Sequence, residues 1–186
     1  MSFRHLKSLF NPRSIAVIGA SARERRMGNV LMRNLLSGQF AGPIMPVNPR
    51  RTSVAGVLTY PSIAALPQTP DLAIICTPAP LVPRLVEELG ERGARAVMVM
   101  ANQLDTTLGA DGRPIERSIL EITRRYEMRL LGGGTLGILV PGLGLNATFS
   151  QIAARPGKLG FVSQRDTVGT MVLDWALRKK VGFSHF

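Results

Sequence analysis

The chain has 186 residues, of which 45% are hydrophobic and 5% aromatic, and its formal net charge is +11. This length fits one well-buried domain of about 130 residues and part of another. The aliphatic composition suits strands that are covered by helices on both faces, and it excludes a disordered chain. No apolar run approaches the roughly 20 residues of a membrane span, and no signal-type apolar segment begins the chain, so we expect a cytoplasmic protein without a membrane partner.

Short aliphatic runs alternate with helical patterns in the first part of the chain. The run at 14–18 ends at a glycine and is too short for a helix, so it predicts a buried strand. Residues 29–36 carry apolar side chains at helical spacing and are followed by a glycine, which predicts a helix that ends there. A second strand is expected at 43–47, where an Asn-Pro pair blocks continuation, and a short helix at 62–66.

The same rhythm continues to about residue 135. The further elements expected are a strand at 71–76, a helix at 81–91, a strand at 96–100, a helix at 114–126 and a strand at 129–131. Regular alternation of strand and helix implies parallel strands joined by right-handed crossovers. Residues 1–135 are therefore predicted to form an α/β domain with a Rossmann-like, doubly wound parallel sheet, and ligand loops should follow the carboxyl ends of its strands.

The rhythm breaks after residue 135, where residues 136–157 form a connector rich in glycine and proline. The elements expected beyond it are a strand at 158–162, a helix at 167–180 and a strand that begins at 182. These elements predict that residues 158–186 are the start of a second α/β domain, and that the chain is a piece of a longer protein. Trp175 lies at helical spacing from Val172 and Met171, which predicts a core position.

The turn after the first strand has the pattern of a phosphate site. Gly19-Ala20-Ser21 leads toward a helix that begins near Gly28, and this arrangement offers free backbone N–H groups and a positive helix end to an anion. A dinucleotide loop would read G-x-G-x-x-G, but Ser21 and Glu24 occupy the second and third glycine positions. The acidic residue that accepts the ribose of NAD is replaced by Asn48-Pro49. The sequence therefore predicts a phosphate-bearing nucleotide other than NAD.

The basic residues form several clusters rather than one stripe. Arg23, Arg25 and Arg26 lie between the glycine turn and the helix, and Arg50 and Arg51 follow the second strand. Guanidinium groups at these positions could bind phosphates through charge-assisted hydrogen bonds, and a solvated arginine-rich loop is the alternative. Stacking aromatic residues are not interleaved with them, so a nucleic-acid partner is not expected.

No catalytic or metal-binding group is expected in this chain. Cys76 ends a predicted strand without a histidine nearby in sequence, which indicates a small buried residue rather than a nucleophile. A single cysteine cannot form a disulfide within the chain and is compatible with a reducing compartment. His5 and His185 are interpreted as a surface residue and an end-of-strand residue.

The order of several motifs resembles the CoA-binding region of ADP-forming acyl-CoA synthetases, a family that includes succinyl-CoA ligase α-subunits. These motifs are LFNPRSIAVIGAS (9–21), PVNP (46–49), PDLA (70–73) and RLLG (129–132). Within that family, a second set resembles the Pat-type bacterial protein lysine acetyltransferases more closely. This set comprises MRNLL (32–36), CT (76–77), LNATFS (145–150) and LDWA (173–176).

The resemblance implies that 1–135 is a CoA-binding domain and that 158–186 begins a flavodoxin-like CoA-ligase domain. Coenzyme A or acetyl-CoA is the implied ligand. The residues implied to hold it are Gly19, Ala20, Ser21, Arg25, Arg26, Gly28, Asn48, Pro49, Arg51, Thr77, Pro78, Ala79, Gly133 and Gly134. The parent protein would transfer an acetyl group from acetyl-CoA to lysines of metabolic enzymes through a downstream module, and the region present here would be catalytically silent.

Two departures from the family pattern affect this expectation. The family usually has Gly-Pro-Asn where this chain has Gly132-Gly133-Gly134, so an asparagine that would help to hold the thiol end is missing. Synthetases read Ser-Gln-Ser-Gly at a helix start that binds a phosphorylated histidine, whereas this chain has Arg165-Asp166 after Ser163-Gln164. A carboxylate there would repel the phosphate and argues against synthetase chemistry.

Two alternatives remain open at the level of sequence. The first is a fragment of an ADP-forming acetate–CoA ligase, which would carry its phosphorylated histidine downstream. The second is a stand-alone CoA-binding module, in which residues 150–186 would pack closed on the first domain. A fragment should instead expose apolar surface or self-associate.

Overall fold

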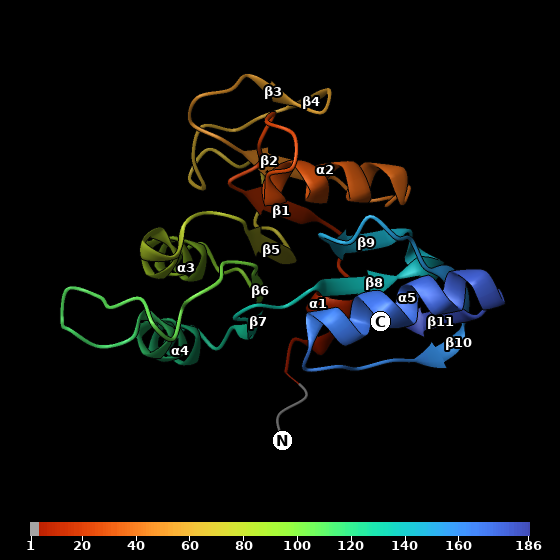
Figure 1. The fold of residues 1–186 in the computed structure, drawn as a ribbon. Helices are drawn as coiled ribbons and strands as arrows, with labels where there is room; N and C mark the ends of the chain where they lie inside the picture. The colour runs from red at the N-terminus through yellow and green to blue at the C-terminus, as the bar shows by residue number, and fades with distance from the viewer. Residues whose placement is uncertain (1–3) are drawn as a thin grey trace.

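The fold, seen in a computed structural model that describes residues 4–186, is built around a five-stranded parallel sheet (Figure 1). The sheet has the order β2-β1-β5-β6-β7, and each pair of neighbours is parallel. Its strands are β1 (Ile15–Ile18), β2 (Ile44–Val47), β5 (Leu72–Ile75), β6 (Ala96–Val99) and β7 (Arg129–Gly132). All five lie at the predicted places, and the Rossmann-like parallel architecture is confirmed.

The central strands are short and completely buried because aliphatic side chains leave them on both faces. In β1, Ala16 and Ile18 pack into one core, whereas Ile15 and Val17 pack into the core on the opposite face. The neighbouring β5 repeats this alternation, and Ile74 at its centre is 0% exposed. Side chains of successive residues in a strand point to opposite faces, so a run without polar residues requires a cover on each side.

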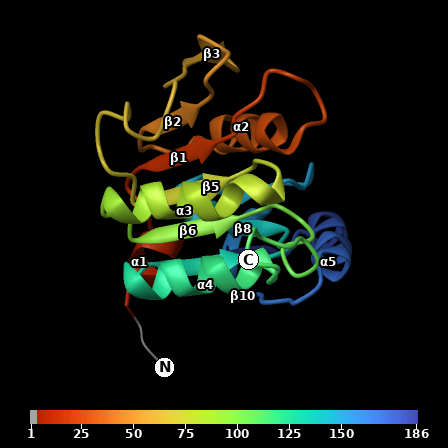
Figure 2. The same ribbon diagram turned by 90° about the vertical axis from the view of Figure 1, so that its left-hand side faces the viewer.

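Helices cover both faces of the sheet, as a doubly wound fold requires (Figure 2). On one face lie α3 (Val82–Glu91), which follows the short 3₁₀ turn η1 (Ala79–Leu81), and α4 (Ile115–Arg125). On the other face lie α1 (Leu6–Phe10) and α2 (Met27–Ser37). The buried residues of α2 include Leu31 and Leu35, which are one turn apart on its inner side.

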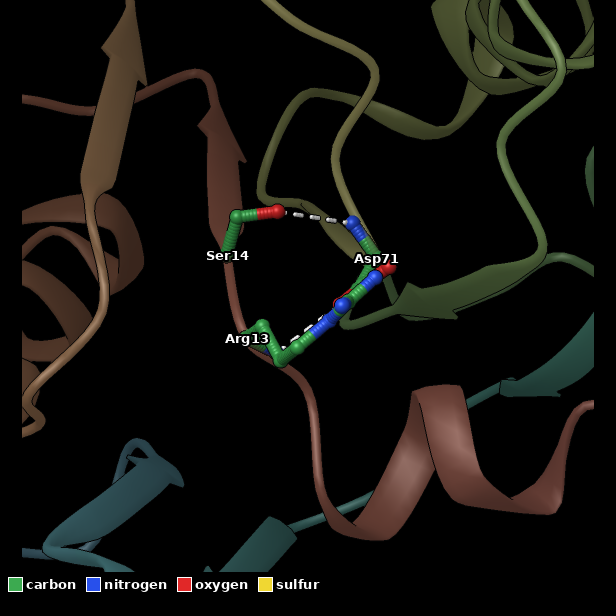
Figure 3. A network of polar contacts seen from close by, with 3 residues as sticks. All are labelled: Arg13, Ser14 and Asp71. Atoms are coloured by element: carbon green, nitrogen blue, oxygen red, sulfur yellow. Dashed lines mark hydrogen bonds and ion pairs between the residues drawn. The ribbon is translucent and has the colours of Figure 1, made fainter.

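A polar network joins β1 and β5 at their amino ends, opposite the ligand loops (Figure 3). The Asp71 carboxylate accepts hydrogen bonds from the backbone N–H of Arg13 at 2.9 Å and from its Nε at 3.3 Å. The backbone N–H of Asp71 donates to Ser14 Oγ at 3.0 Å. These contacts fix the register at which the two central strands enter the sheet.

Two segments differ from the sequence prediction. Residues 62–66 form turns rather than the predicted helix, although Ile63 and Leu66 are still buried in the core. Two buried side chains three residues apart give the same pattern in a turn as in a short helix, which is why the prediction was wrong. A small antiparallel hairpin, β3 (Ser53–Val54) and β4 (Val57–Leu58), was not predicted because its strands have only two residues each.

The expected connector contains an antiparallel hairpin of β8 (Gly137–Val140) and β9 (Leu145–Thr148), with the 3₁₀ turn η2 (Pro141–Leu143) between them. Ile138 and Val140 pack into the core shared with α2, whereas Leu139 packs toward the C-terminal segment. Asn34 Nδ2 donates to the carbonyl oxygens of Thr148 and Ser150 at 2.8 Å each. The β8–β9 hairpin is therefore packed against α2 and the core on that face of the sheet.

The C-terminal segment is a strand-helix-strand unit of β10 (Arg155–Gly160), α5 (Asp166–Lys179) and β11 (Gly182–His185), and its two strands are parallel. The helix buries Leu173 and Ala176, whereas Met171 is 67% and Trp175 54% exposed. The prediction of Trp175 as a core residue was wrong. Helical spacing identifies residues that share a face, but it does not say which face is buried.

Within residues 4–186 no helix has both the length and the apolar character needed to cross a membrane.

Candidate nucleotide-binding site

A cavity of about 910 Å³ lies at the carboxyl ends of β1, β2, β5 and β6. In the sheet, the chain passes from β1 to β2 on one side, and from β5 to β6 on the other side. The connections therefore diverge between the neighbouring strands β1 and β5. In doubly wound sheets, the crevice at such a point of divergence is where ligands bind. The topology therefore places a ligand crevice between the loop after β1 and the loop after β5.

The floor of this crevice is a glycine turn on which the first helix packs closely. Gly19 has a φ of +86°, and a Cβ atom there would lie 2.9 Å from Cγ2 of Thr77. A Cβ atom on Gly28, in the first turn of α2, would lie 2.2 Å from the carbonyl oxygen of Gly19. Both positions therefore require glycine, Gly19 for its left-handed backbone and Gly28 for the contact between helix and turn.

Backbone donors are available on both sides of this turn. The amide groups of Ala20, Ser21, Met27 and Gly28 have no hydrogen-bond acceptor among residues 4–186. The positive end of the α2 macrodipole lies at the same place, since the helix begins at Met27. Unpaired amides together with a helix N-terminus favour an anionic group such as a phosphate.

Asn48 joins the two loops that border the crevice. Its Nδ2 donates to the carbonyl oxygen of Ala20 at 2.7 Å, and its Oδ1 accepts the backbone N–H of Arg50 at 2.8 Å. Asn29 supports the same turn from α2 by donating to the carbonyl oxygen of Ser21 at 3.0 Å. Asn48 stands where NAD-binding proteins have the acidic residue that binds the ribose, and here it joins the loop after β1 to the loop after β2.

The charged residues that line the crevice are all arginines. They are Arg23, Arg26, Arg50 and Arg51, and none of the aspartates and glutamates within residues 4–186 lines it. Each is exposed, and none of the four forms an ion pair with a carboxylate in the described part of the chain. Unpaired guanidinium groups around unpaired amides make the crevice suited to a ligand with several phosphate charges.

The loop after β5 contributes a thiol and a hydroxyl. Burial raises the pKa of the Cys76 thiol to about 12, so the group is protonated at neutral pH and is a poor nucleophile. Thr77 Oγ1 is buried without a hydrogen-bond partner in residues 4–186. A buried hydroxyl in the lining of a cavity can gain a partner when a polar ligand binds.

The structure brings most of the predicted site residues together. Those that line the crevice are Gly19, Ala20, Ser21, Arg26, Gly28, Asn48, Arg51, Thr77, Pro78 and Ala79. Arg25 and Pro49 lie in the bordering loops but not in its lining, and Gly133 and Gly134 line a different cavity. The prediction missed Ala101, Asn102 and Gln103, which follow β6. The rule that ligand loops follow strand ends would have identified them.

The second cavity has a volume of about 650 Å³ and lies between the loop after β7 and the C-terminal segment. Its lining includes Gly133, Gly134 and the first residues of α5. Asp166 is the first residue of that helix, and its Oδ1 accepts the backbone N–H of Thr167 at 2.6 Å. The carboxylate therefore occupies the helix N-terminus at which an external anion would bind.

The parallel α/β fold, with an arginine-lined crevice at the carboxyl ends of its strands, is the arrangement typical of a nucleotide-binding domain. The sequence signature of the family described as CoA binding domain matches residues 13–141. The chain belongs to this family of CoA-binding domains.

Several relatives of known activity are similar to almost the whole chain. The ADP-forming acetate–CoA ligase I of Archaeoglobus fulgidus is 38% identical over 179 residues, which cover 96% of this chain and 26% of the relative. The α-subunit of the ADP-forming acetate–CoA ligase I of Pyrococcus furiosus is 35% identical over 183 residues, which cover 96% of this chain and 39% of that subunit. The chain thus spans about a quarter to two fifths of the length of these relatives.

A solved structure extends the similarity to three dimensions. The dinucleotide-forming acetyl-coenzyme A synthetase 1 of Ca. Korarchaeum cryptofilum, in complex with phosphate and ADP, superposes with a TM-score of 0.86 at 31% identity. The match covers 97% of this chain and 38% of that one. These comparisons favour the ligase alternative, and they give no support to the expected Pat-type acetyltransferase.

Proposed function

We propose that this chain binds coenzyme A as part of an ADP-forming acyl-CoA ligase. The observation that carries the proposal is the crevice at the divergence of β1 and β5. In the part of the chain that the structure describes, four arginines without ion-pair partners line this crevice, and no carboxylate does. Coenzyme A carries a diphosphate and a 3′-phosphate, and so it needs more positive charge than NAD. The absence of an acidic residue at Asn48 removes the usual acceptor for the ribose of NAD.

The glycine turn and the start of α2 would hold the diphosphate. The free amides of Ala20, Ser21 and Gly28 would donate to its oxygens, and the helix N-terminus would stabilise the charge. The arginines of the loops after β1 and β2 would bind the remaining phosphate oxygens. Asn48 would keep both loops in place by its two hydrogen bonds rather than by contact with the ligand.

The ligase part of the proposal rests on the relatives. In the named ADP-forming acetate–CoA ligases the matched region is only part of a longer enzyme. This chain would supply the bound coenzyme A, and the phosphoryl-transfer chemistry would come from the remaining regions. The assignment of 1–135, 136–157 and 158–186 as domain, connector and start of a second domain is likewise part of the proposal, as is a cytoplasmic location.

A protein acetyltransferase is the second candidate, because of one local feature. Asp166 and Arg165 stand at the start of α5, where the resemblance to synthetases implies a phosphate-binding Ser-Gly pair. The Asp166 carboxylate would disfavour a phosphoryl group there. A parent protein that uses acetyl-CoA to modify lysines of metabolic enzymes would not need that phosphate. Incorporation of ³²P from labelled ATP into a histidine of the full-length parent favours the ligase, and lysine acetylation without it favours the second candidate.

Titration calorimetry on the 186-residue chain tests the ligand. We expect binding of coenzyme A, weaker binding of dephospho-coenzyme A, and no detectable heat from NAD. Removal of one charge-assisted contact in Arg51→Gln should weaken the binding of coenzyme A by about tenfold, which corresponds to about 1.4 kcal/mol.

Arg33→Gln is the matched control for this variant. Arg33 is an exposed arginine of α2 that does not line the crevice, so its replacement removes the same charge at a distance. Equal losses of affinity in Arg51→Gln and Arg33→Gln would show a general effect of net charge rather than a specific contact. Tight binding of NAD without binding of coenzyme A would overturn the proposal.

A further inference from the structure

Residues 22–26, here called the arginine strap, join the glycine turn to α2 and are held only loosely. All of them are exposed, and none packs into a hydrophobic core of the described chain. Within residues 4–186, their backbone N–H groups form two hydrogen bonds. Arg23 donates to Ser21 Oγ at 3.1 Å, and Arg26 donates to the carbonyl oxygen of Arg23 at 3.4 Å. A segment with exposed backbone and few buried contacts can change conformation at a low cost in free energy.

Arg25, in the middle of the strap, has a left-handed backbone. Its φ is +61°, a conformation in which the Cβ atom approaches the following carbonyl oxygen. Glycine and asparagine tolerate this conformation better than a residue with a long side chain does. In the part of the chain that the structure describes, Arg25 forms no hydrogen bond and no ion pair that would offset the cost. The strap thus keeps an unfavourable backbone conformation at one residue.

The position of Arg25 differs from that of its neighbours. Arg23 and Arg26 line the nucleotide crevice, whereas Arg25 does not. The charged groups that do line the crevice are arginines, so they repel a further guanidinium group as long as no anion is bound. The phosphates of a bound ligand reverse the sign of this interaction. A change of φ at Arg25 to a negative value also redirects its side chain and removes the steric cost of the left-handed backbone.

We propose that Arg25 is a phosphate-binding residue that joins the site only when coenzyme A is bound. In the free protein the strap is open, and the guanidinium group of Arg25 lies outside the crevice. In the complex the backbone of Arg25 leaves the left-handed region, and the strap closes over the phosphates. This inference rests on the proposed binding of coenzyme A. It goes further by assigning a closing movement to the strap and a role in it to Arg25.

A pair of charge variants tests whether Arg25 reaches the ligand. In titration calorimetry on the 186-residue chain, Arg25→Gln should weaken the binding of coenzyme A by about fivefold or more, because a charge-assisted contact is lost. Arg33→Gln removes the same charge from an exposed position of α2 outside the crevice lining and should weaken binding by less than about twofold. Equal losses in the two variants would mean that Arg25 acts only through net charge, and would overturn the inference.

A second pair tests the change of backbone conformation. Arg25→Asn and Arg25→Gln both carry a neutral amide and differ by one methylene group, but asparagine tolerates the left-handed backbone of the open strap better. Closure therefore gains less in Arg25→Asn, which should bind coenzyme A about threefold more weakly than Arg25→Gln does. If Arg25→Asn binds as tightly as Arg25→Gln or more tightly, Arg25 stays left-handed in the complex and the strap does not close in this way.

Limited proteolysis follows the closure without any variant. Trypsin cleaves after Arg23, Arg25 and Arg26, and saturating coenzyme A should slow cleavage at these sites by at least about tenfold, because the open strap is depleted. Cleavage after the exposed Lys180, which lies outside the crevice lining, should not change and is the internal control. Unchanged cleavage of the strap at saturating coenzyme A would show that it stays open.

The outcomes separate this inference from the function on which it rests. If coenzyme A binds but Arg25→Gln behaves like Arg33→Gln, the inference is wrong and the proposed function stands. If coenzyme A does not bind to the chain at all, the proposed function is wrong, and the inference is wrong with it.

Discussion

The five-stranded sheet and the C-terminal strand-helix-strand unit are built from similar elements but are covered very differently. In the sheet, helices lie on both faces, and β1, β5 and β6 are buried throughout (Figure 2). In the C-terminal unit, β10 is exposed along its length, and α5 buries one face while Met171 and Trp175 on another face are exposed. Parallel strands are normally found with both faces covered. The comparison shows that the five-stranded sheet has a hydrophobic core on each face, whereas the C-terminal unit is covered on one side only.

The core of the sheet should carry the larger share of the stability. Replacement of the fully buried Ile74 by alanine should lower the free energy of unfolding by about 4 kcal/mol, through lost burial and the cavity that remains. The same kind of truncation at Leu173, which is 1% exposed in α5, should cost about 2 kcal/mol because it belongs to a smaller hydrophobic cluster than Ile74 does. Urea denaturation of both variants measures the difference. Equal losses would mean that the two regions are equally well packed.

The polar network at the amino ends of β1 and β5 tests how firmly the two central strands are joined (Figure 3). Asp71→Ala should cost about 1.5 kcal/mol, because the backbone N–H of Arg13 loses its acceptor. Arg13→Ala removes only the ion pair, in which the arginine side chain is 88% exposed, and should cost less than about 0.5 kcal/mol. Thermal unfolding of the two variants measures both values. A larger loss in Arg13→Ala would assign the stabilisation to the ion pair instead.

The exposed face of α5 should contribute least to the fold. Trp175→Ser should change the free energy of unfolding by less than about 0.5 kcal/mol, since the indole is 54% exposed. The same variant should lower any self-association of the chain, because an exposed apolar surface promotes contact between molecules. Urea denaturation and sedimentation velocity give the two readouts. A loss of several kcal/mol would mean that this face is covered by the chain itself.

The difference between the two regions also explains how far the sequence could predict them. The buried runs at β1, β5 and β6 are aliphatic without interruption and too short for a helix, which is typical of a strand covered on both faces. Residues 62–66 and the hairpin of β8 and β9 have weak local patterns because tertiary contacts determine their conformation. The prediction for Trp175 was wrong because hydrophobic residues occur at helical spacing on more than one face of α5. The exposed face carries Val168, Met171 and Trp175, so the pattern does not identify the buried face.

In the candidate site, too, features with a local sequence signal were predicted, and features that depend on tertiary packing were not. The turn at Gly19 and the loop after β5 were predicted because strand ends and glycines identify them in the sequence. The placement of Gly133 and Gly134 in a separate cavity was not predicted, since it depends on how the C-terminal segment packs beside β7.

A crystal structure of the chain soaked in coenzyme A tests the central claim most directly. The account predicts a diphosphate within hydrogen-bond distance of the backbone amides of Ala20, Ser21 and Gly28, with arginine side chains around it. A ligand bound elsewhere on the molecule, with these amides in contact only with water, would contradict it.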